Sequence, residues 1–320
     1  MNAELAKDFI NKWQAGETNF HLTTSGSTGP PTQILLEKKK MQWSAANTAS
    51  VVHPLPSDSL LCCLPCSKIG GLMMLVRAME WGIPIEVIEP VANPFTERRT
   101  CTIVSLAPMQ LFHVLSNKDS VEHLKTVRIV IIGGGELSAK LENMIADNAF
   151  SNTVFYHSYG MTETYSHIAL RTINGKDSTQ YFVPFSDVTV TKDSNNCAVI
   201  QLPFENQPLQ TTDIIALYPD RTFEVLGRSD FMINSGGVKL QPEQIERAIA
   251  NTLRPEHLFI ISSEKDEVLG NKLILIAEKH FEYTLEDLQF LKAINPYAVP
   301  KAIRIIETFE RNEGGKIKRF

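Results

Sequence analysis

The feature that most limits how this chain can fold is an alternation, through its first half, of short apolar runs and segments with helical character. The runs are rich in Val and Ile, which favours buried strands. Strands that alternate with helices form βαβ units and a mostly parallel sheet. The expected strands span residues 59–66, 83–89, 102–106, 128–132 and 153–157, and the expected helices 108–116 and 138–148.

The pattern changes after about residue 171. Runs separated by turn signals predict a smaller, more antiparallel β region, with strands at 181–191, 198–202, 213–217 and 222–226. From residue 241 the order is helix, two strands, helix and strand, at 242–251, 257–262, 272–278, 285–293 and 302–308. The expected fold class is α/β: a large N-terminal domain with mostly parallel sheets flanked by helices plus a small β region, and a small C-terminal α+β domain.

Composition excludes several classes of protein. The 320 residues carry 31 Lys+Arg and 36 Asp+Glu, a net charge of −5, which argues against a nucleic-acid binder that relies on a phosphate-seeking surface. No stretch reaches the roughly 18 apolar residues of a membrane span. Residues 1–17 lack the apolar core of a signal peptide and indicate a short amphipathic helix. With no export signal, the five cysteines indicate reduced thiols in a cytoplasmic protein.

Two glycine-containing segments are candidates for binding phosphate or nucleotide. Residues 23–32 combine Ser and Thr hydroxyls with two glycines, so that backbone N–H groups and hydroxyls can converge on phosphate oxygens. The alternative is a flexible polar loop. Residues 133–136, Gly-Gly-Gly-Glu, lie between a strand and a helix, a standard place for a nucleotide. The alternative there is a tight turn within a βαβ unit.

Polar residues gather at three further places. Residues 156–164 end a strand, where open α/β sheets place ligands, and Glu163 offers carboxylate oxygen to Mg²⁺; otherwise the segment belongs to the core. Asp213 is a good acceptor for two ribose hydroxyls, in a region that otherwise forms surface turns. The basic tail, residues 311–319, is either solvated or brings a lysine onto a polyphosphate. Cys63-x-x-Cys66 has no second ligand pair and indicates buried thiols rather than zinc.

Taken together and in this order, the motifs resemble those of the acyl-adenylate-forming superfamily, which includes acyl- and aryl-CoA synthetases, luciferases and adenylation domains. Residues 24–32 look like its phosphate loop, residues 133–136 look like its adenine-side glycine turn, and residues 159–163 match its Tyr-Gly-x-Thr-Glu motif. Residues 227–230 match its Gly-Arg-x-Asp hinge, residues 243–246 its Glu-x-x-Glu helix, and residues 315–319 its terminal Gly-Lys-Ile-x-Arg. Within the superfamily, residues 64–78 are similar to a segment of the 2-succinylbenzoate–CoA ligases of menaquinone biosynthesis.

The resemblance implies an ATP-dependent acid–CoA ligase with two half-reactions at one site. A carboxylate attacks the α-phosphate of ATP to give acyl-AMP and pyrophosphate, and the CoA thiol then displaces AMP. The implied cofactors are ATP, Mg²⁺ and coenzyme A, and the implied acid is 2-succinylbenzoate. Lys316, Thr162 and Glu163 are the implied catalytic residues: Lys316 brings positive charge to the bridging oxygens, Thr162 contacts the α-phosphate, and Glu163 holds the metal.

The resemblance also implies binding residues and a hinge. Those for the nucleotide are Thr24, Ser25, Gly26, Ser27, Thr28, Gly29, Gly133, Gly134, Gly135, Glu136, Ser158, Tyr159, Gly160, Asp213 and Arg228. Those for the acid and CoA are Lys68, Gly70, Gly71, Arg77, His157, Gly236 and Gly237. Lys68 and Arg77 are candidates for the carboxylates, because a dicarboxylate needs a second cationic contact. Asp230 would be the hinge between a large ATP- and acid-binding domain, residues 1–228, and a small mobile domain, residues 230–320.

The sequence departs from the superfamily pattern at four positions. Thr32 stands where the phosphate loop usually has lysine, and Thr212 where a glycine precedes the ribose contact. Glu310 stands where the tail usually has proline, and Lys68 where many members have histidine or an aromatic residue. Only residues 1–23 precede the loop, so we expect a large domain that is shortened at its N-terminus and buries its exposed sheet surface in a homodimer. Three other functions stay open: another aryl- or acyl-CoA synthetase, an adenylating enzyme that loads a carrier protein, and a non-catalytic nucleotide-binding derivative of the fold.

Overall fold

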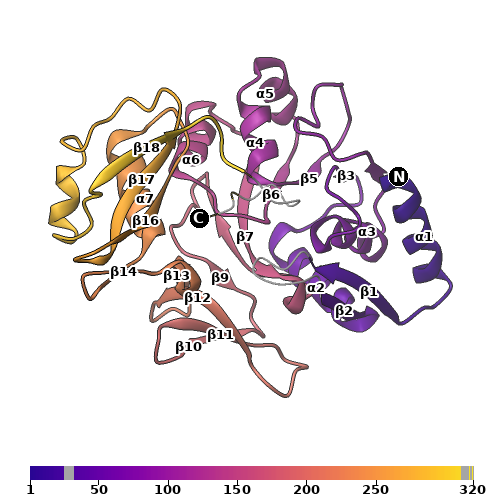
Figure 1. Cartoon of the computed structure of the whole chain (residues 1–320). Coiled ribbons are helices and arrows are strands. Elements are labelled where there is room, and N and C mark those ends of the chain that lie inside the picture. Colours follow the sequence, from indigo (N-terminus) through magenta and orange to yellow (C-terminus); the bar gives the residue numbers. More distant parts are fainter. Residues whose placement is uncertain (25–31, 311–316, 318, 320) are drawn as a thin grey trace. The chain divides into compact units, whose positions relative to one another are not determined.

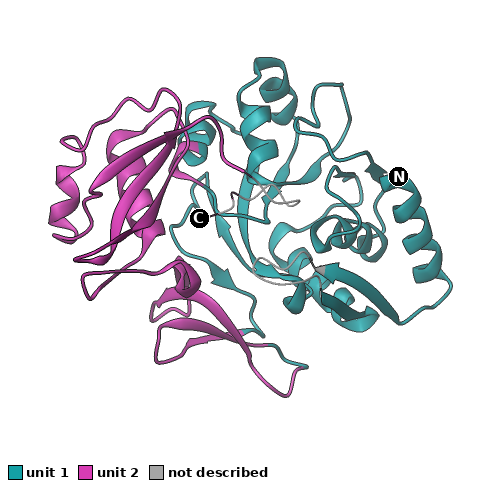
Figure 2. Cartoon of the chain, in the orientation of Figure 1, with its two compact units in different colours: residues 1–137, 141–188, 202–204 teal, residues 138–140, 189–201, 205–320 magenta. Residues whose placement is uncertain are grey.

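The chain forms two compact units, which Figure 2 shows in different colours. The structure is a computed structural model that describes residues 1–24, 32–310, 317 and 319. Unit 1 comprises residues 1–137, 141–188 and 202–204, and unit 2 comprises residues 138–140, 189–201 and 205–320. Asp230, the predicted hinge residue, lies within unit 2, and movement about it stays a prediction.

Unit 1 is built on a seven-stranded sheet, of which Figure 1 labels β3, β5, β6, β7 and β9. Its strands are β3 (Leu60–Cys62), β4 (Ile85–Val87), β5 (Ile103–Leu106), β6 (Ile129–Ile132), β7 (Val154–Met161), β8 (Ser166–Thr172) and β9 (Val183–Pro184). The spatial order is β4-β3-β5-β6-β7-β8-β9, with β3 to β7 paired in parallel and β8 and β9 antiparallel. The parallel strands lie where the β-branched runs predicted them, and the expected α/β class is confirmed.

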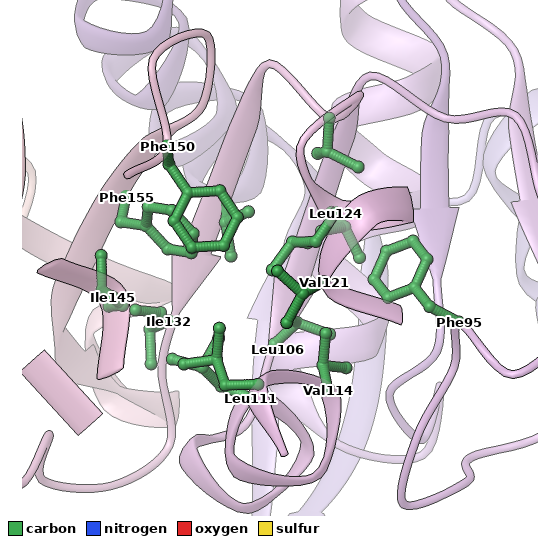
Figure 3. Packing of buried hydrophobic residues seen from close by; sticks show 14 of the residues in the cluster. Phe95, Leu106, Leu111, Val114, Val121, Leu124, Ile132, Ile145, Phe150 and Phe155 are labelled. Carbon is green, nitrogen blue, oxygen red and sulfur yellow. The ribbon is translucent and has the colours of Figure 1, made fainter. Parts of the chain in front are cut away.

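Helices cover both faces of this sheet. They are α1 (Asn2–Gln14), α2 (Lys38–Val52), α3 (Ile69–Trp81), α4 (Pro108–Leu115), α5 (Lys118–Leu124) and α6 (Ala139–Asp147). Successive residues of β3 point to opposite faces: Leu61 joins the apolar cluster that includes Leu111 of α4, whereas Cys62 Sγ contacts the carbonyl of Gly71 in α3. Figure 3 shows the first of these faces, where Leu111, Ile132 and Ile145 pack together.

Helix ends in unit 1 follow ordinary capping chemistry. α4 begins at Pro108, whose fixed φ and missing N–H suit the first helical position. Before α5, the Asn117 side chain accepts the backbone N–H of Ser120 at 3.0 Å. α3 ends at Trp81 and is capped by Gly82, which has a left-handed φ of 65°. The signals at Pro108 and Asn117 begin the two helices that connect β5 to β6.

A two-stranded antiparallel hairpin stands apart from the main sheet. It consists of β1 (Asn19–Thr24) and β2 (Thr32–Glu37), and Thr24 lies opposite Thr32 at its end. The predicted phosphate loop is therefore the connection between two paired strands. Its residues Ser25, Gly26, Ser27, Thr28 and Gly29 lie outside the described residues.

Unit 2 contains an antiparallel sheet, a short hairpin and a three-stranded sheet. The strands are β10 (Thr189–Lys192), β11 (Cys197–Gln201), β12 (Leu209–Leu217), β13 (Phe223–Arg228), β14 (Ile233–Ser235), β15 (Val238–Leu240), β16 (Phe259–Asp266), β17 (Gly270–Glu278) and β18 (Ala302–Ile306). β10 to β13 pair in chain order, and β17 pairs antiparallel with β16 and parallel with β18. α7 (Pro242–Leu253) packs through Ile245 and Ile249 on one face of the β16–β18 sheet.

One predicted helix of unit 2 is wrong. Residues 285–293 form only a short 3-10 turn, η3 (Gln289–Ala293). Leu288 and Leu291 are buried at a spacing of three, which suits a 3-10 turn. Pro296 follows closely and restricts the preceding residue to extended backbone, so the turn cannot continue as a helix.

All five cysteines are buried free thiols, as the sequence predicted. The Cys63 Sγ donates to the carbonyl of Ser105, and the Sγ atoms of Cys62 and Cys66 lie 3.9 Å apart. Burial raises the pKa of the Cys63 thiol to about 12, so it stays protonated near neutral pH. In the part of the chain that the structure describes, no helix is both long and apolar enough to span a membrane.

Candidate functional site

The glycine turn after β6 leaves backbone open to a ligand. The N–H of Gly133 donates to the carbonyl of Leu106 at 3.1 Å, and Ser158 Oγ of β7 donates to the carbonyl of Ile132 at 2.9 Å. A Cβ on Gly133 would stand 2.6 Å from Ser158 Oγ, so a side chain here would displace the Ser158 hydroxyl from the carbonyl of Ile132. Gly134 has φ +81°, and among the described residues nothing lies within 4 Å of where its Cβ would be.

The neighbouring strand supports this turn. β7 lies beside β6, with His157 opposite Ile132, and His157 Nε2 lies 3.1 Å from the carbonyl oxygen of Gly135. The Tyr159 ring lies 5.7 Å from that of Phe182. Glu136 is exposed directly after the turn. The carboxyl ends of β6 and β7 thus bring the predicted residues 133–136 and 157–160 together, at an edge where parallel sheets place ligands.

A tight corner follows β7 and carries the next predicted residues. The chain turns through η1 (Thr162–Thr164), and Tyr165 and Ser166 have φ of 61° and 139°, values that non-glycine residues rarely adopt. The buried Thr164 accepts the N–H of Met161 at 2.9 Å and donates to nearby carbonyls. A Cβ on Gly160 would stand 2.8 Å from the carbonyl carbon of Ser166, so only glycine permits this approach.

Glu163 stands at the outside of the corner. It is exposed and makes no hydrogen bond or ion pair with the residues that the structure describes. A single carboxylate with both oxygens available suits Mg²⁺, which takes one or two protein carboxylates and completes its coordination with water and phosphate oxygens. No group of three His, Cys, Asp or Glu side chains gathers within residues 1–24 and 32–310 as an all-protein metal site would require. The donor set therefore fits a nucleotide-bound Mg²⁺.

Arg77 connects the predicted acid-binding segment to this corner. It lies on α3, is 2% exposed, and donates from Nη2 to Ser166 Oγ at 3.0 Å. The same Nη2 lies 3.4 Å from His167 Nδ1, and Nη1 lies 3.9 Å from Met74 Sδ. Burial lowers the pKa of Arg77 to about 10. Among the described residues no carboxylate pairs with it, so a buried cation lies next to the corner that carries Glu163.

The other predicted acid-site residues lie at the start of α3. Lys68 is half-buried and directly precedes the helix, and Gly70 and Gly71 form its first turn. A Cβ on Gly71 would stand 2.8 Å from the carbonyl oxygen of Leu64, so the helix packs on the preceding loop through bare backbone. Lys68 and Arg77 are nine residues apart, about 13 Å along a helix axis.

The predicted ribose and hinge residues form one cluster in unit 2. Asp213 of β12 and Arg228 of β13 are paired across the sheet, with Asp213 Oδ1 and Arg228 Nη1 3.5 Å apart. Arg228 Nη2 donates to Asp230 Oδ2 at 2.8 Å, and Thr212 Oγ1 donates to the same oxygen at 3.2 Å. Thr212, a departure from the superfamily pattern, is thus a partner of the predicted hinge residue.

The remaining predicted residues are a turn and the tail. Gly236 and Gly237 connect β14 to β15 with φ of 58° and 84°, the geometry of a two-residue hairpin turn. Lys316 lies outside the described residues. Arg319, beyond it, is bound to Glu246 of α7 at 2.6 and 2.8 Å. This basic residue is therefore anchored rather than solvated.

Sequence reasoning missed two side chains of the corner, Ser166 and His167, and included Thr164 only as the last residue of segment 156–164. Neither Ser166 nor His167 had a signal of its own, since β8 shows only a strand pattern. His167 is 5% exposed, and burial together with the Arg77 charge lowers its pKa well below the usual value.

Three comparisons place the chain in a family. The family model described as AMP-binding enzyme matches residues 6–199. A structure of an acyl-CoA synthetase (AMP-forming)/AMP-acid ligase II-like protein from Dyadobacter fermentans is 34% identical, with a TM-score of 0.65, over 98% of this chain and 91% of that one. A 2-succinylbenzoate–CoA ligase of Listeria monocytogenes is 25% identical over 98% of this chain and 71% of its own length.

The fold agrees with these matches. The o-succinylbenzoate CoA synthetase of Bacillus subtilis, solved with its acyl-adenylate intermediate, has a TM-score of 0.77 and 20% identity over 93% of this chain and 67% of that chain. At that identity the likeness concerns the fold. The family match covers more than half of the chain, and the Dyadobacter relative is similar over nearly all of it. The chain belongs to the AMP-binding enzyme family of adenylate-forming acid–CoA ligases.

Proposed function

We propose that the chain is an ATP-dependent acid–CoA ligase whose acid carries two carboxylates, with 2-succinylbenzoate as the candidate. The observation that carries the proposal is Arg77, a cation that is 2% exposed and has only neutral partners among the described residues. A buried guanidinium without an anion is costly. An anionic group that arrives with the substrate explains why such a cost is tolerated.

The position of Lys68 supports a second carboxylate. Lys68 directly precedes α3 and Arg77 lies within it, so the segment offers two cations, and we expect each to contact a different carboxylate of the acid. The relatives named 2-succinylbenzoate–CoA ligase, such as that of Listeria monocytogenes, add support for this acid. We also expect the chain to act in the cytoplasm, where ATP and CoA are present.

In the proposed first half-reaction, an oxygen of the substrate carboxylate attacks the α-phosphorus of ATP. The bond from that phosphorus to the pyrophosphate oxygen breaks, which leaves acyl-adenylate and pyrophosphate. Glu163 would hold Mg²⁺, which neutralises charge on the phosphate oxygens. Thr162 would contact the α-phosphate, residues 133–136 the adenine, and Asp213 and Arg228 the ribose. Lys316 would bring positive charge to the bridging oxygen.

In the proposed second half-reaction, the CoA sulfur attacks the acyl carbon and AMP leaves. The thiol proton passes to solvent, so the products are thioester and AMP. The hairpin turn Gly236-Gly237 would contact CoA through its backbone after rotation about Asp230.

Pyrophosphate release with a panel of aromatic acids, with and without CoA, tests the proposal. We expect release that depends on 2-succinylbenzoate and thioester formation when CoA is present. No acid-dependent release would favour a nucleotide-binding protein, and adenylation without thioester would favour a carrier-protein acceptor. Lys68→Ala should raise the KM for 2-succinylbenzoate far more than that for ATP; equal effects would contradict a role in acid binding.

A further inference from the structure

A buried histidine links three elements of unit 1 behind Arg77. His167 lies on β8, and its Nε2 is 3.0 Å from Thr48 Oγ1 of α2. Its Nδ1 is 3.4 Å from Arg77 Nη2 of α3. The imidazole also lies 5.7 Å from the Phe185 ring. Each ring nitrogen therefore faces one defined polar partner.

The hydrogen bonds determine which ring nitrogen carries the proton. The single hydroxyl proton of Thr48 is donated to the carbonyl of Ser44 at 2.9 Å. Thr48 Oγ1 is then an acceptor towards His167, so Nε2 bears the hydrogen. Nδ1 keeps its lone pair, and it accepts from the Arg77 guanidinium, which can only donate. Burial and the Arg77 charge lower the pKa of His167, which agrees with a neutral ring.

This arrangement orients Arg77 without neutralising it. The three partners of Arg77 are Ser166 Oγ, His167 Nδ1 and Met74 Sδ, and all are uncharged. An Asp or Glu in place of His167 would orient the guanidinium equally well but would satisfy its charge. A neutral acceptor leaves the positive charge of Arg77 uncompensated. Arg77 Nε is buried and has no partner among the described residues.

We propose that His167, fixed in its Nε2–H tautomer by Thr48, is a positioning residue that holds Arg77 ready for the second carboxylate and so sets a preference for dicarboxylic over monocarboxylic acids. The inference rests on the proposed function. It adds His167 and Thr48, two side chains that do not take part in the chemistry but orient a group that binds the substrate.

Matched substitutions test the proposal. His167→Leu removes the Nδ1 acceptor, whereas His167→Asn keeps a carbonyl oxygen near that position. Thr48→Val removes the acceptor that fixes the tautomer, and Thr48→Ser keeps it. The quantity to compare is kcat/KM for 2-succinylbenzoate divided by kcat/KM for 4-oxo-4-phenylbutanoate, which has the same skeleton without the ring carboxylate.

We expect this ratio to fall about tenfold or more in His167→Leu and Thr48→Val, and to stay within about threefold of the unsubstituted protein in His167→Asn and Thr48→Ser. The KM for ATP should not change in any of the four. An unchanged ratio in His167→Leu would overturn the proposal. So would an equal loss with both acids and ATP, which would indicate a purely structural role.

A second measurement separates this inference from the proposed function. In the full-length protein, imidazole ¹⁵N shifts report the tautomer of His167 without any catalysis. We expect the neutral Nε2–H form at pH 6.5 in the unsubstituted protein and in Thr48→Ser. An imidazolium or an Nδ1–H ring in the unsubstituted protein would overturn the inference even if the ligase is active. An Nε2–H ring in a protein that releases no pyrophosphate with any acid would uphold the arrangement and contradict the function.

Discussion

Arg77 on α3 donates a hydrogen bond from Nη2 to Oγ of Ser166 on β8, at 3.0 Å. The two residues are 89 positions apart in the chain. The bond ties the helix that follows Lys68 to the corner that carries Thr162 and Glu163. Together with the approach of Arg77 to His167, it links the predicted acid-binding segment to the chain that directly follows the predicted nucleotide-binding motif.

Removing the Arg77 charge should make the protein more stable but weaken its binding of the acid. We expect Arg77→Met to raise the free energy of unfolding by about 1–3 kcal/mol, because it replaces a buried cation that has no anionic partner with an apolar side chain of similar length. The same variant should raise the KM for 2-succinylbenzoate at least about tenfold. Urea denaturation and steady-state kinetics measure the two effects.

Arg128→Met is the control for this prediction. Arg128 pairs with Asp58, whose carboxylate is 3% exposed and would be left without its cation. Burial alone would raise the pKa of Asp58, but the bonds from Arg128 and from the Leu55 N–H lower it. This control variant should therefore be destabilised. A stability loss in Arg77→Met as large as that in Arg128→Met would contradict the claim that Arg77 is a buried cation without an anionic partner.

Glu163→Gln should impair adenylation without affecting the fold. The side chain is exposed and makes no bond with the residues that the structure describes, so the melting temperature should change by less than about 1 °C. Pyrophosphate release should fall at least about tenfold and should need more Mg²⁺ for half-maximal rate. The exposed Glu17→Gln is the comparison. A Mg²⁺ titration curve identical in Glu163→Gln and the unsubstituted protein would exclude Glu163 as the ligand.

Gly160→Ala should distort the corner, since its Cβ would overlap the backbone of Ser166. We expect a loss of about 2–4 kcal/mol in the free energy of unfolding and little acid-dependent pyrophosphate release. Gly134→Ala makes a contrast, because nothing described lies near its Cβ and only its positive φ opposes the substitution, at about 1–2 kcal/mol. Equal stability of Gly160→Ala and Gly134→Ala would show that Gly160 of β7 does not approach the backbone of Ser166 so closely.

The stability of the protein should depend on pH through His167. Burial and then the Arg77 charge lower its pKa well below 6.5 in the folded chain. In the unfolded chain the imidazole gains a proton below about pH 6.5, so there the unfolded state binds more protons and the free energy of unfolding falls as pH decreases. We expect a slope up to about 1.4 kcal/mol per pH unit steeper than that of His167→Asn. Equal slopes in urea denaturation series below pH 6.5 would contradict a buried neutral ring.

The parallel sheet was predictable because its strands are short β-branched runs, and burial on both faces demands such runs. α3 was not predicted: Ile69–Trp81 is apolar on nearly every side and has two glycines in its first turn, so its periodicity carries no signal. The helix expected at 285–293 shows the opposite error. The spacing of its leucines predicted an α-helix, but the structure has a short 3-10 turn there.

The candidate site likewise contains residues that the sequence marks and contacts that it does not. Gly160 and Glu163 belong to a contiguous motif, so the sequence alone marks them as functional candidates. The interaction of Arg77 with Ser166 and His167 depends on how α3 packs against β8, two elements that no local pattern relates. The tautomer of His167 depends further on Thr48, from a third element. Such a network is a property of tertiary packing and had to be read from the structure.

The most direct test of the central claim, a ligase for a dicarboxylic acid, is mass spectrometry of the products formed from ATP, Mg²⁺, CoA and 2-succinylbenzoate. The account predicts succinylbenzoyl-CoA and AMP with the unsubstituted protein, and little thioester from 4-oxo-4-phenylbutanoate. A benzoyl- or fatty-acyl-CoA formed in competition, with no succinylbenzoyl-CoA, would contradict it.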